Sequence, residues 1–320
     1  MLRRGARWLP FILLCLWAGA SAPSAAAPIG AHEDDDAPGQ ATPANGGKAY
    51  AVRLNRPMKA GQQYRWSADS TLVNTIPPAK GGPAVADTVS VHLDAVVQIL
   101  NVDKDGEPTE MAATIEECTA RTGKEKKVIA RPGRVILVEA GKWKSKLTAA
   151  VGTLTIDEDA LLRSVLSLPR VDDTSDDDLY GTPKPVYVGE AWNVRADQVA
   201  RSWASAGYRL KPQNISGTVK LKSAETVDGA ECVRVTGRTK MEHFLPPALD
   251  LPETVQIEDA TCEVKFTRLL PSDTSKPVLQ ESHSMTLHFT LKRDPRAMIP
   301  GPREGKLLRS VGVKLQPMNG

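Results

Sequence analysis

The sequence has few aromatic residues, few cysteines and only short apolar runs. Aromatic residues make up 5% of the 320 positions, which disfavours a sugar-binding surface built from aromatic faces. The sequence contains neither a glycine-rich phosphate or dinucleotide loop nor a Gly-x-Ser-x-Gly nucleophile elbow. We therefore expect a protein that is not an enzyme, with no catalytic, cofactor-binding or metal-binding residue and no cofactor.

The N-terminus has the order of a secretory signal. Residues 1–7 (MLRRGAR) carry three arginines, a short apolar run follows over 8–17, and small residues stand at 18–20. This order predicts a signal peptide over 1–22 and an extracytoplasmic, periplasmic or secreted protein that is soluble after cleavage. Residues 23–47 are rich in Ala, Pro, Gly and acidic residues, and this composition predicts a disordered tether.

The charge balance argues against a nucleic-acid partner. Loss of the three leader arginines would lower Lys plus Arg from 41 to 38, which equals the 38 Asp plus Glu. A chain without excess positive charge gains little from releasing the counterions of a nucleic acid. We expect a different class of partner.

Cysteine is scarce, and its spacing fits no zinc site. Of 4 cysteines, Cys15 falls in the predicted leader, which leaves Cys118, Cys232 and Cys262. None of these three lies two to four residues from another Cys or a His. An odd number allows at most one intramolecular disulfide, so one disulfide or buried thiols remain as alternatives.

The main pattern in the sequence is the alternation of apolar and polar residues. From Val89 to Ile99 every odd position is apolar, which predicts a long strand with one buried face. Roughly a dozen such strands fit the chain, enough for a large sheet that curls or pairs. Residues 131–134 (RPGR) predict a hairpin turn between strands near 128–129 and 135–138. Further short strands are predicted at 262–266, 285–291 and 311–315.

Two segments carry helix signals. Thr155 and Glu158 have the spacing of a capping box, and Leu161, Leu162, Val165 and Leu166 follow with helical period until Pro169 ends the pattern. A weaker signal runs from a cap at Asp197 to Gly207. The predicted fold class is mainly β: curved antiparallel sheet, as a half-barrel or sandwich, with one or two short helices.

A weak internal repeat links the two halves. Gly61 and Tyr64 match Gly189 and Trp192, and the Asp-Gly pair at 105–106 matches the one at 228–229. One interpretation is duplication of a β unit; the other is chance similarity of turns. Duplication predicts a first β unit over 48–170, ending in a short helix, and a second over 171–320. One continuous sheet and two lobes both remain open.

The stretch NVDKDGEPTE, residues 101–110, resembles a calcium loop. With Asn101 at position 1 of an EF-hand loop, position 12 is Ala112, where a bidentate Glu is required. The flanks are predicted strands, and Asp-Gly favours a tight hairpin. We therefore predict a turn.

Other polar candidates have plain structural interpretations. The acidic run 172–178 (DDTSDDD) is expected to be a solvated loop, with a divalent cation as the less favoured alternative. His92 and His288 have the parity of polar faces, whereas His283 has the parity of a buried face. Four tryptophans outside the leader are expected to pack in the core or at strand edges: Trp66, Trp143, Trp192 and Trp203.

Three motifs carry a family resemblance: Gly61-Gln-Gln-Tyr64, Val102-Asp-Lys-Asp-Gly106 and Val188-Gly-Glu-Ala-Trp192. Together they resemble a bacterial family of secreted, β-rich proteins of unknown function, over about Tyr50 to Arg293. The resemblance implies an extracytoplasmic location and a curved sheet like the half-barrel of lipoprotein carriers. It implies no catalytic residue.

The leading hypothesis is a non-enzymatic envelope or secreted protein that binds an apolar ligand or lipid in a concave sheet. The alternative is a structural or protein-interaction module of the cell envelope, which pairs through its sheet edges. A hydrolase comes third, and it would need two carboxylates, or a histidine with a nucleophile, converging in one cleft.

Overall fold

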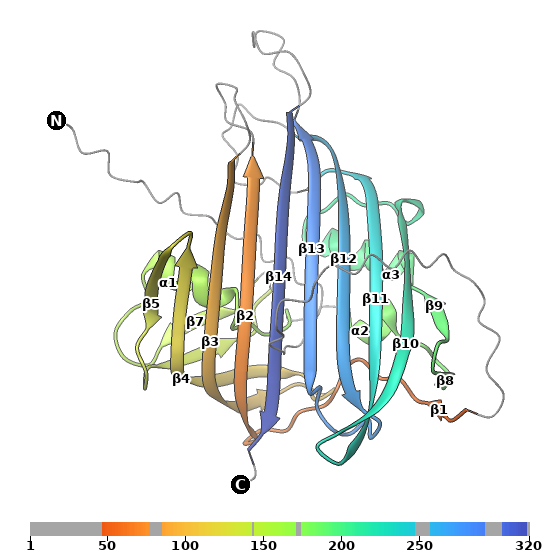
Figure 1. Cartoon of the computed structure of the whole chain (residues 1–320), viewed down its shortest axis with the longest axis horizontal. Coiled ribbons are helices and arrows are strands. Elements are labelled where there is room, and N and C mark those ends of the chain that lie inside the picture. Colours follow the sequence, from red (N-terminus) through yellow and green to blue (C-terminus); the bar gives the residue numbers. More distant parts are fainter. Residues whose placement is uncertain are drawn as a thin grey trace.

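The computed structural model is one large open β-sheet with helices on one side (Figure 1). It describes residues 47–76, 85–142, 144–170, 174–246, 257–291 and 303–318. The mainly β class is confirmed. The predicted signal peptide, the predicted tether up to residue 46, and Trp143 lie outside the described residues.

The large sheet has 12 antiparallel strands in the order β7-β6-β4-β3-β2-β14-β13-β12-β11-β10-β9, and β5 also pairs with β4. The last strand of the chain, β14, pairs with β2, so the two halves form one continuous sheet. The strands are β2 (Gln63–Ile76), β3 (Val85–Val102), β4 (Pro108–Thr122), β5 (Glu125–Ala130), β6 (Val135–Glu139), β7 (Lys146–Ala149), β9 (Ala191–Asn193), β10 (Ile215–Val227), β11 (Ala230–Phe244), β12 (Ile257–Pro271), β13 (Gln280–Leu291) and β14 (Arg303–Pro317).

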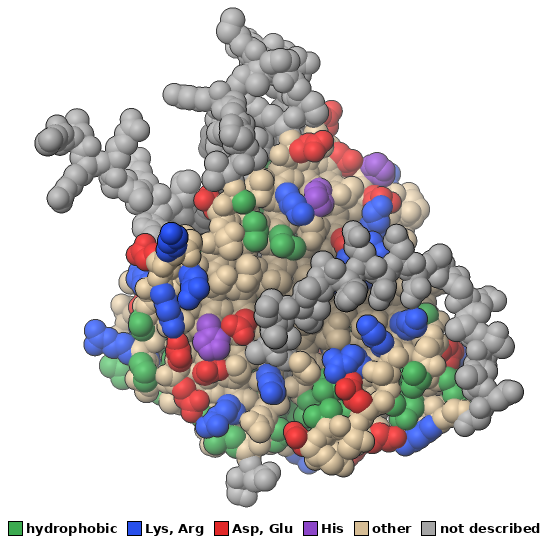
Figure 2. Space-filling model, viewed as in Figure 1, with side chains coloured by type: hydrophobic (Ala, Val, Ile, Leu, Met, Phe, Trp, Pro, Cys, Tyr) green, Lys and Arg blue, Asp and Glu red, His purple; other side chains and the backbone are tan. Residues whose placement is uncertain are grey.

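The helices lie on one face of the sheet, the rear face in Figure 1, which we call the inner face. The opposite, outer face is seen in Figure 2, where charged side chains of both signs are spread over the surface. Among the described ranges, no helix is long and apolar enough to cross a bilayer. The remaining elements are α1 (Ile156–Arg163), α2 (Asp176–Tyr180), α3 (Ala196–Ser205), the 3-10 turn η1 (Pro212–Asn214), and the two-stranded sheet β1 (Ala49–Tyr50) with β8 (Val186–Tyr187).

The alternating pattern placed most strands correctly. In β3, the odd positions from Val91 to Ile99 are buried on the inner face. The predicted hairpin at 131–134 is wrong, because β5 and β6 do not pair with each other and both pair with β4. Pro132 has no N–H to donate to a ladder, and the turn instead bonds to β4 through Gly133 N and Ile115 O, 2.8 Å apart.

The capping box at α1 is confirmed in both directions. Thr155 N donates to Glu158 Oε2 at 2.8 Å, and Glu158 N donates to Thr155 Oγ1 at 3.2 Å. The helix ends at Arg163 and not near Pro169, because Ser164 closes it with a bond from its N–H to Leu161 O. The second predicted helix exists as α3, but its N-cap is Arg195; Asp197 lies in the first turn.

NVDKDGEPTE is a turn between β3 and β4, as predicted. Asp103 N donates to Glu107 O at 2.9 Å, and Gly106 takes a φ of 83° that favours glycine. The turn at Asp228 and Gly229 is tighter, with both residues at positive φ and Val227 paired with Ala230.

The segments matched in the repeat start alike and then diverge. Gly61 N donates to Ile99 O at 2.8 Å, and Gly189 N donates to Leu221 O at 2.7 Å. Tyr64 is then paired with Val97, as Trp192 is with Val219. After that point β2 continues as a strand, whereas the second segment turns into α3. Duplication therefore stays a prediction.

The core forms two clusters on the inner face. The first packs β2–β7 and β14 against α1, and the second packs β9–β13 against α2 and α3. All three described cysteines are buried free thiols, which decides between the two alternatives. Burial raises the pKa of Cys118 to about 12, so this thiol is inert.

Candidate functional site

A cavity of about 850 Å³ lies between the inner face of the sheet and α1. Pockets that hold small ligands have volumes of about 300–1,000 Å³. The walls come from β2, β3, β4, β5 and β7, from the loop 152–155, and from α1, with Arg309 of β14 at one side. The apolar part of the lining includes Leu72, Val89, Val91, Ala120, Ile129 and Leu161.

Small side chains leave this space open. Ser70, Ala120 and Ala149 are buried on the strands, and Ala160 faces the same space from α1. Larger residues at these positions would fill the space, as Leu162 and Leu166 fill the core beside it. The cavity is therefore a product of residue size along three strands and one helix.

Exposure changes from one side of the cavity to the other. Ile156 at the start of α1 is 75% exposed, and Glu125 and Lys127 of β5 are exposed too. Ser70 and Val91, which line the opposite side, are buried. The exposed side gives a ligand a route of entry, and the strands form a rigid wall.

The lining of the cavity also carries polar and charged groups, among them the carboxylates of Asp87, Glu125, Asp157 and Asp159. Arg163 of α1 donates from Nε and Nη2 to the Asp159 carboxylate, at 2.8 and 2.5 Å. Its Nη1 is buried and has no hydrogen-bond partner among the described residues, and the same holds for Oδ1 of Asn74 on β2. Arg309, which is 7% exposed, also lines the cavity.

A buried charge network occupies the inner face between the two core clusters. Arg268 of β12 donates from Nε to Glu281 Oε1 of β13 at 2.7 Å, and it also pairs with Asp176 of α2. His283 pairs with Glu281. The side chains of Arg268, Asp176 and Glu281 are 3%, 4% and 1% exposed.

Burial shifts the ionisation of this network. Desolvation raises the pKa of Glu281 to about 8, although Arg268 opposes the shift. Burial together with the charges of Arg268 and Arg309 holds the pKa of His283 well below its usual range, so the imidazole is neutral. Glu281, which shares Arg268 with Asp176, therefore retains a proton near neutral pH.

The Glu281 carboxyl predicts a specific pH dependence of stability. Its pKa is higher folded than unfolded, so the folded protein binds more protons between about pH 4.5 and 8. Taken alone, this carboxyl makes the free energy of unfolding fall as pH rises through that window. The lowered pKa of His283 acts in the opposite direction below about pH 6.5, so the fall should be seen between about pH 6.5 and 8. Glu281→Gln cannot titrate and should remove this slope. Urea unfolding at pH 5, 6, 7 and 8 measures it, and parallel curves for both proteins would contradict the assignment.

Sequence reasoning placed part of this network wrongly. It read the run 172–178 as a solvated loop, yet Asp176 is buried in α2 and paired with Arg268; Asp172 and Asp173 lie outside the described residues. It missed Arg268 and Glu281. Two carboxylates and a histidine do converge here, but they do not line the cavity. We interpret the network as a structural element.

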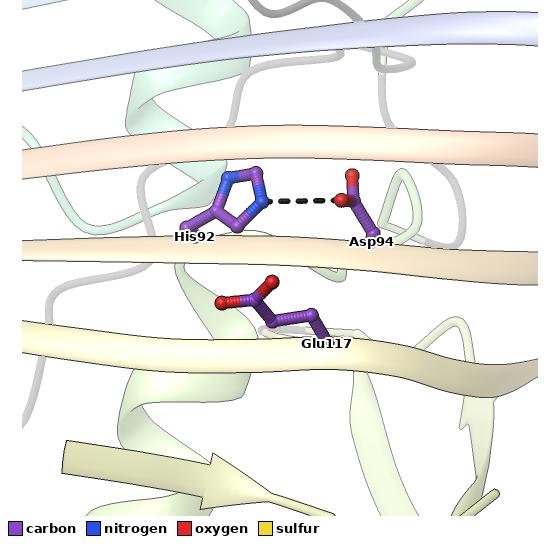
Figure 3. A group of neighbouring side chains, drawn as sticks. All are labelled: His92, Asp94 and Glu117. Atoms are coloured by element: carbon purple, nitrogen blue, oxygen red, sulfur yellow. Dashed lines mark hydrogen bonds and ion pairs between the residues drawn. The ribbon is translucent and has the colours of Figure 1, made fainter. Parts of the chain in front are cut away.

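One group of possible metal ligands occurs among the described residues, on the outer face (Figure 3). His92 and Asp94 of β3 and Glu117 of β4 offer ligand atoms within 4.8 Å of one another. His92 also contacts Asp69 at 2.9 Å, and Glu117 pairs with Lys126 at 3.1 Å.

The electrostatics at His92 are those of an ion-pair cluster. Partial burial is outweighed by the hydrogen bonds to Asp69 and Asp94, which raise the pKa of His92 above its usual value. The site therefore stabilises the protonated imidazole. The sequence had placed His92 on a polar face, and the structure confirms that position.

The other histidines and tryptophans of the described residues lie where the sequence predicted them. His288 is exposed on the outer face, and His283 points inward. Trp66 and Trp203 are buried at 4% and 5% exposure, and Trp192 is half-buried. No family model matches the chain, and no relative is found among curated proteins.

Proposed function

We propose that the protein is a non-enzymatic binding protein that holds an apolar ligand in the cavity between the sheet and α1. The observation that carries the proposal is the cavity, about 850 Å³ in volume, with an apolar part of its wall formed by aliphatic side chains of β2–β5. An apolar ligand that enters it leaves water and gains contact with preformed walls.

The lining supports recognition of an extended apolar chain. Each methylene moved from water into such a site contributes about 0.8 kcal/mol, which is roughly a fourfold change in Kd. Affinity should therefore rise with chain length until the cavity between Val91 and Ile156 is full. The signal peptide proposed for residues 1–22 and the proposed likeness to secreted β-rich proteins support a location outside the cytoplasm for this binding.

Narrowing the cavity should abolish binding. Ala160→Trp adds an indole from the α1 side, into space that the ligand needs, and leaves every residue of the sheet unchanged. We expect affinity for a neutral fluorescent dye such as Nile red to fall at least tenfold, on the order of the loss of two buried methylenes. Ala204→Trp, at an exposed position of α3, is the matched control and should bind like wild type.

Fluorescence titration of the two variants and wild type decides the proposal. If wild type binds no apolar dye, or if both tryptophan variants bind it equally well, the cavity is not a ligand site. The thermal midpoint of each variant shows whether it is folded.

The alternative, a module that pairs through its sheet edges, has less support. The outermost strands are β7 with 4 residues and β9 with 3. Short edge strands are a common means of preventing edge-to-edge pairing. The cavity therefore gives the better account of what the fold can do.

A further inference from the structure

We propose that the outer face carries a site for a divalent transition-metal ion, best matched by Zn²⁺, with His92, Asp94 and Glu117 as ligands and Asp69 holding the histidine ring. The site is independent of the ligand cavity, because it lies on the opposite face of the sheet. The sequence alone predicted no metal ligand, because these residues belong to three strands that come together only in the assembled sheet.

Strand pairing fixes the relative positions of these four side chains. Asp69 of β2 lies directly opposite His92 of β3, and Asp94 of β3 lies directly opposite Glu117 of β4. His92 and Asp94 are two positions apart on one strand, so both point to the outer face. The pairing skips Glu116, so β4 bulges directly beside the site. Such bulges commonly redirect a side chain next to a functional site.

The arrangement brings two like charges face to face. Asp94 and Glu117 are directly opposite on neighbouring antiparallel strands, where carboxylates repel each other. Lys126 offsets part of the charge of Glu117, at 3.1 Å. A divalent cation between the two carboxylates removes their repulsion. Together with Lys126 it also balances the charge of all three carboxylates around a neutral His92.

The histidine ring is held in the manner of a metal ligand. Its Nδ1 lies 2.9 Å from Asp69 Oδ1, and its Nε2 lies 3.2 Å from Asp94 Oδ2. When Nδ1–H donates to Asp69, the lone pair of the neutral ring is on Nε2, the atom that faces Asp94. A carboxylate that fixes the tautomer in this way commonly accompanies a metal-bound histidine. The metal bond forms to the neutral ring, so binding releases the Nε2 proton to solvent.

The distances and the ligand types favour zinc. The three ligand atoms lie within 4.8 Å of one another. Zinc bonds of about 2.0–2.2 Å place tetrahedral ligands about 3.4 Å apart, a separation that the partly exposed carboxylates of Asp94 and Glu117 can reach by side-chain rotation (Figure 3). Ca²⁺ and Mg²⁺ take oxygen ligands, whereas imidazole suits zinc. A water molecule completes the four ligands.

Isothermal titration calorimetry of the tag-free protein with ZnCl2 tests the site, with CaCl2 titrated separately. We expect wild type to bind zinc at a site that depends on His92, and to bind calcium more weakly. Loss of an outer partner of a metal-bound histidine lowers metal affinity about tenfold to a hundredfold, and Asp69→Asn should have this effect. His92→Gln and Glu117→Gln each remove a ligand, so each should lose at least as much affinity.

His243→Gln is the matched control. His243 is exposed and also pairs with an aspartate, Asp259, at 3.1 Å, but it belongs to no group of three possible ligands among the described residues. Its variant should bind zinc like wild type. Thermal midpoints in EDTA show that each variant is folded, and added zinc should raise the midpoint of wild type but not of His92→Gln.

Three results would overturn the proposal. The first is a wild type that binds no zinc. The second is equal zinc affinity of wild type, His92→Gln and Glu117→Gln, which would mean adventitious binding elsewhere on the chain. The third is calcium bound as tightly as zinc, which would remove the role of the imidazole.

Discussion

Replacing Arg268 by Met is expected to lower the free energy of unfolding by about 3–5 kcal/mol, the cost of breaking a buried ion pair from one side. The guanidinium bonds to Glu281 and Asp176, and all three side chains are at most 4% exposed. Met fills much of the same volume but offers no donor. The Asp176 carboxylate then loses its pair with Arg268 in a low-dielectric interior.

Urea unfolding at pH 7 measures the loss, and Arg238→Met on the neighbouring strand β11 is the control. Arg238 pairs with Glu263 at 2.5 Å, but its side chain is 62% exposed. Exposed pairs contribute about 0–1 kcal/mol. A loss of similar size in both variants would show that the Arg268 pair has no special weight.

A triple variant distinguishes the loss of the attraction made by Arg268 from the cost of burying carboxyl groups that no longer pair with it. If the damage in Arg268→Met comes from the two buried carboxyl groups that have lost Arg268, then adding Asp176→Asn and Glu281→Gln should recover part of the stability. Networks replaced as a whole by neutral groups often lose little. A further fall in the stability of the triple variant would mean that each of the three polar side chains stabilises the fold independently.

The regular parts of this fold could be predicted because their signals are local. A strand with one buried face repeats every two residues, and β3 follows that period from Val91 to Ile99. The capping box of Thr155 and Glu158 spans four residues and is present as predicted. The turn at 131–134 failed because its partner is not local: both flanking strands pair with β4.

The charge network was missed, although part of its signal was present in the sequence. Arg268 has the parity of Phe266 and Leu270, which are buried, and Glu281 has the parity of Leu287. A charged residue at the parity of a buried face must find a partner or lose its charge. Asp176 carried no such signal, because its burial depends on Arg268, 92 residues away.

The polar groups of the cavity could likewise be predicted from the sequence only in part. Ser70 and Asn74 continue the buried face of β2 that begins with Tyr64 and Trp66, so their inward position follows from parity. The cavity itself does not follow, because its volume depends on where α1 lies against β5 and on small residues spread over several strands. These small residues and α1 come together only in the assembled fold.

Two similar tryptophan substitutions, one in each core cluster, should have different consequences. Trp66→Ala and Trp203→Ala should each cost about 3–5 kcal/mol of stability, because both indoles are buried and truncation leaves a cavity. Trp66 belongs to the cluster beside the ligand cavity. Its Nε1 donates to Val165 O at 3.2 Å, two residues beyond the end of α1.

Only Trp66→Ala should also weaken ligand binding. Loss of the indole frees the chain that follows α1, and α1 is one wall of the cavity, so we expect dye affinity to fall about tenfold, or about 1.4 kcal/mol. Trp203 packs against Tyr208, with ring centroids 4.8 Å apart, in the other cluster. Its variant should bind the dye like wild type once folded. Equal losses of affinity in the two variants would mean that the clusters act as one unit, and that α1 is not held in place by Trp66.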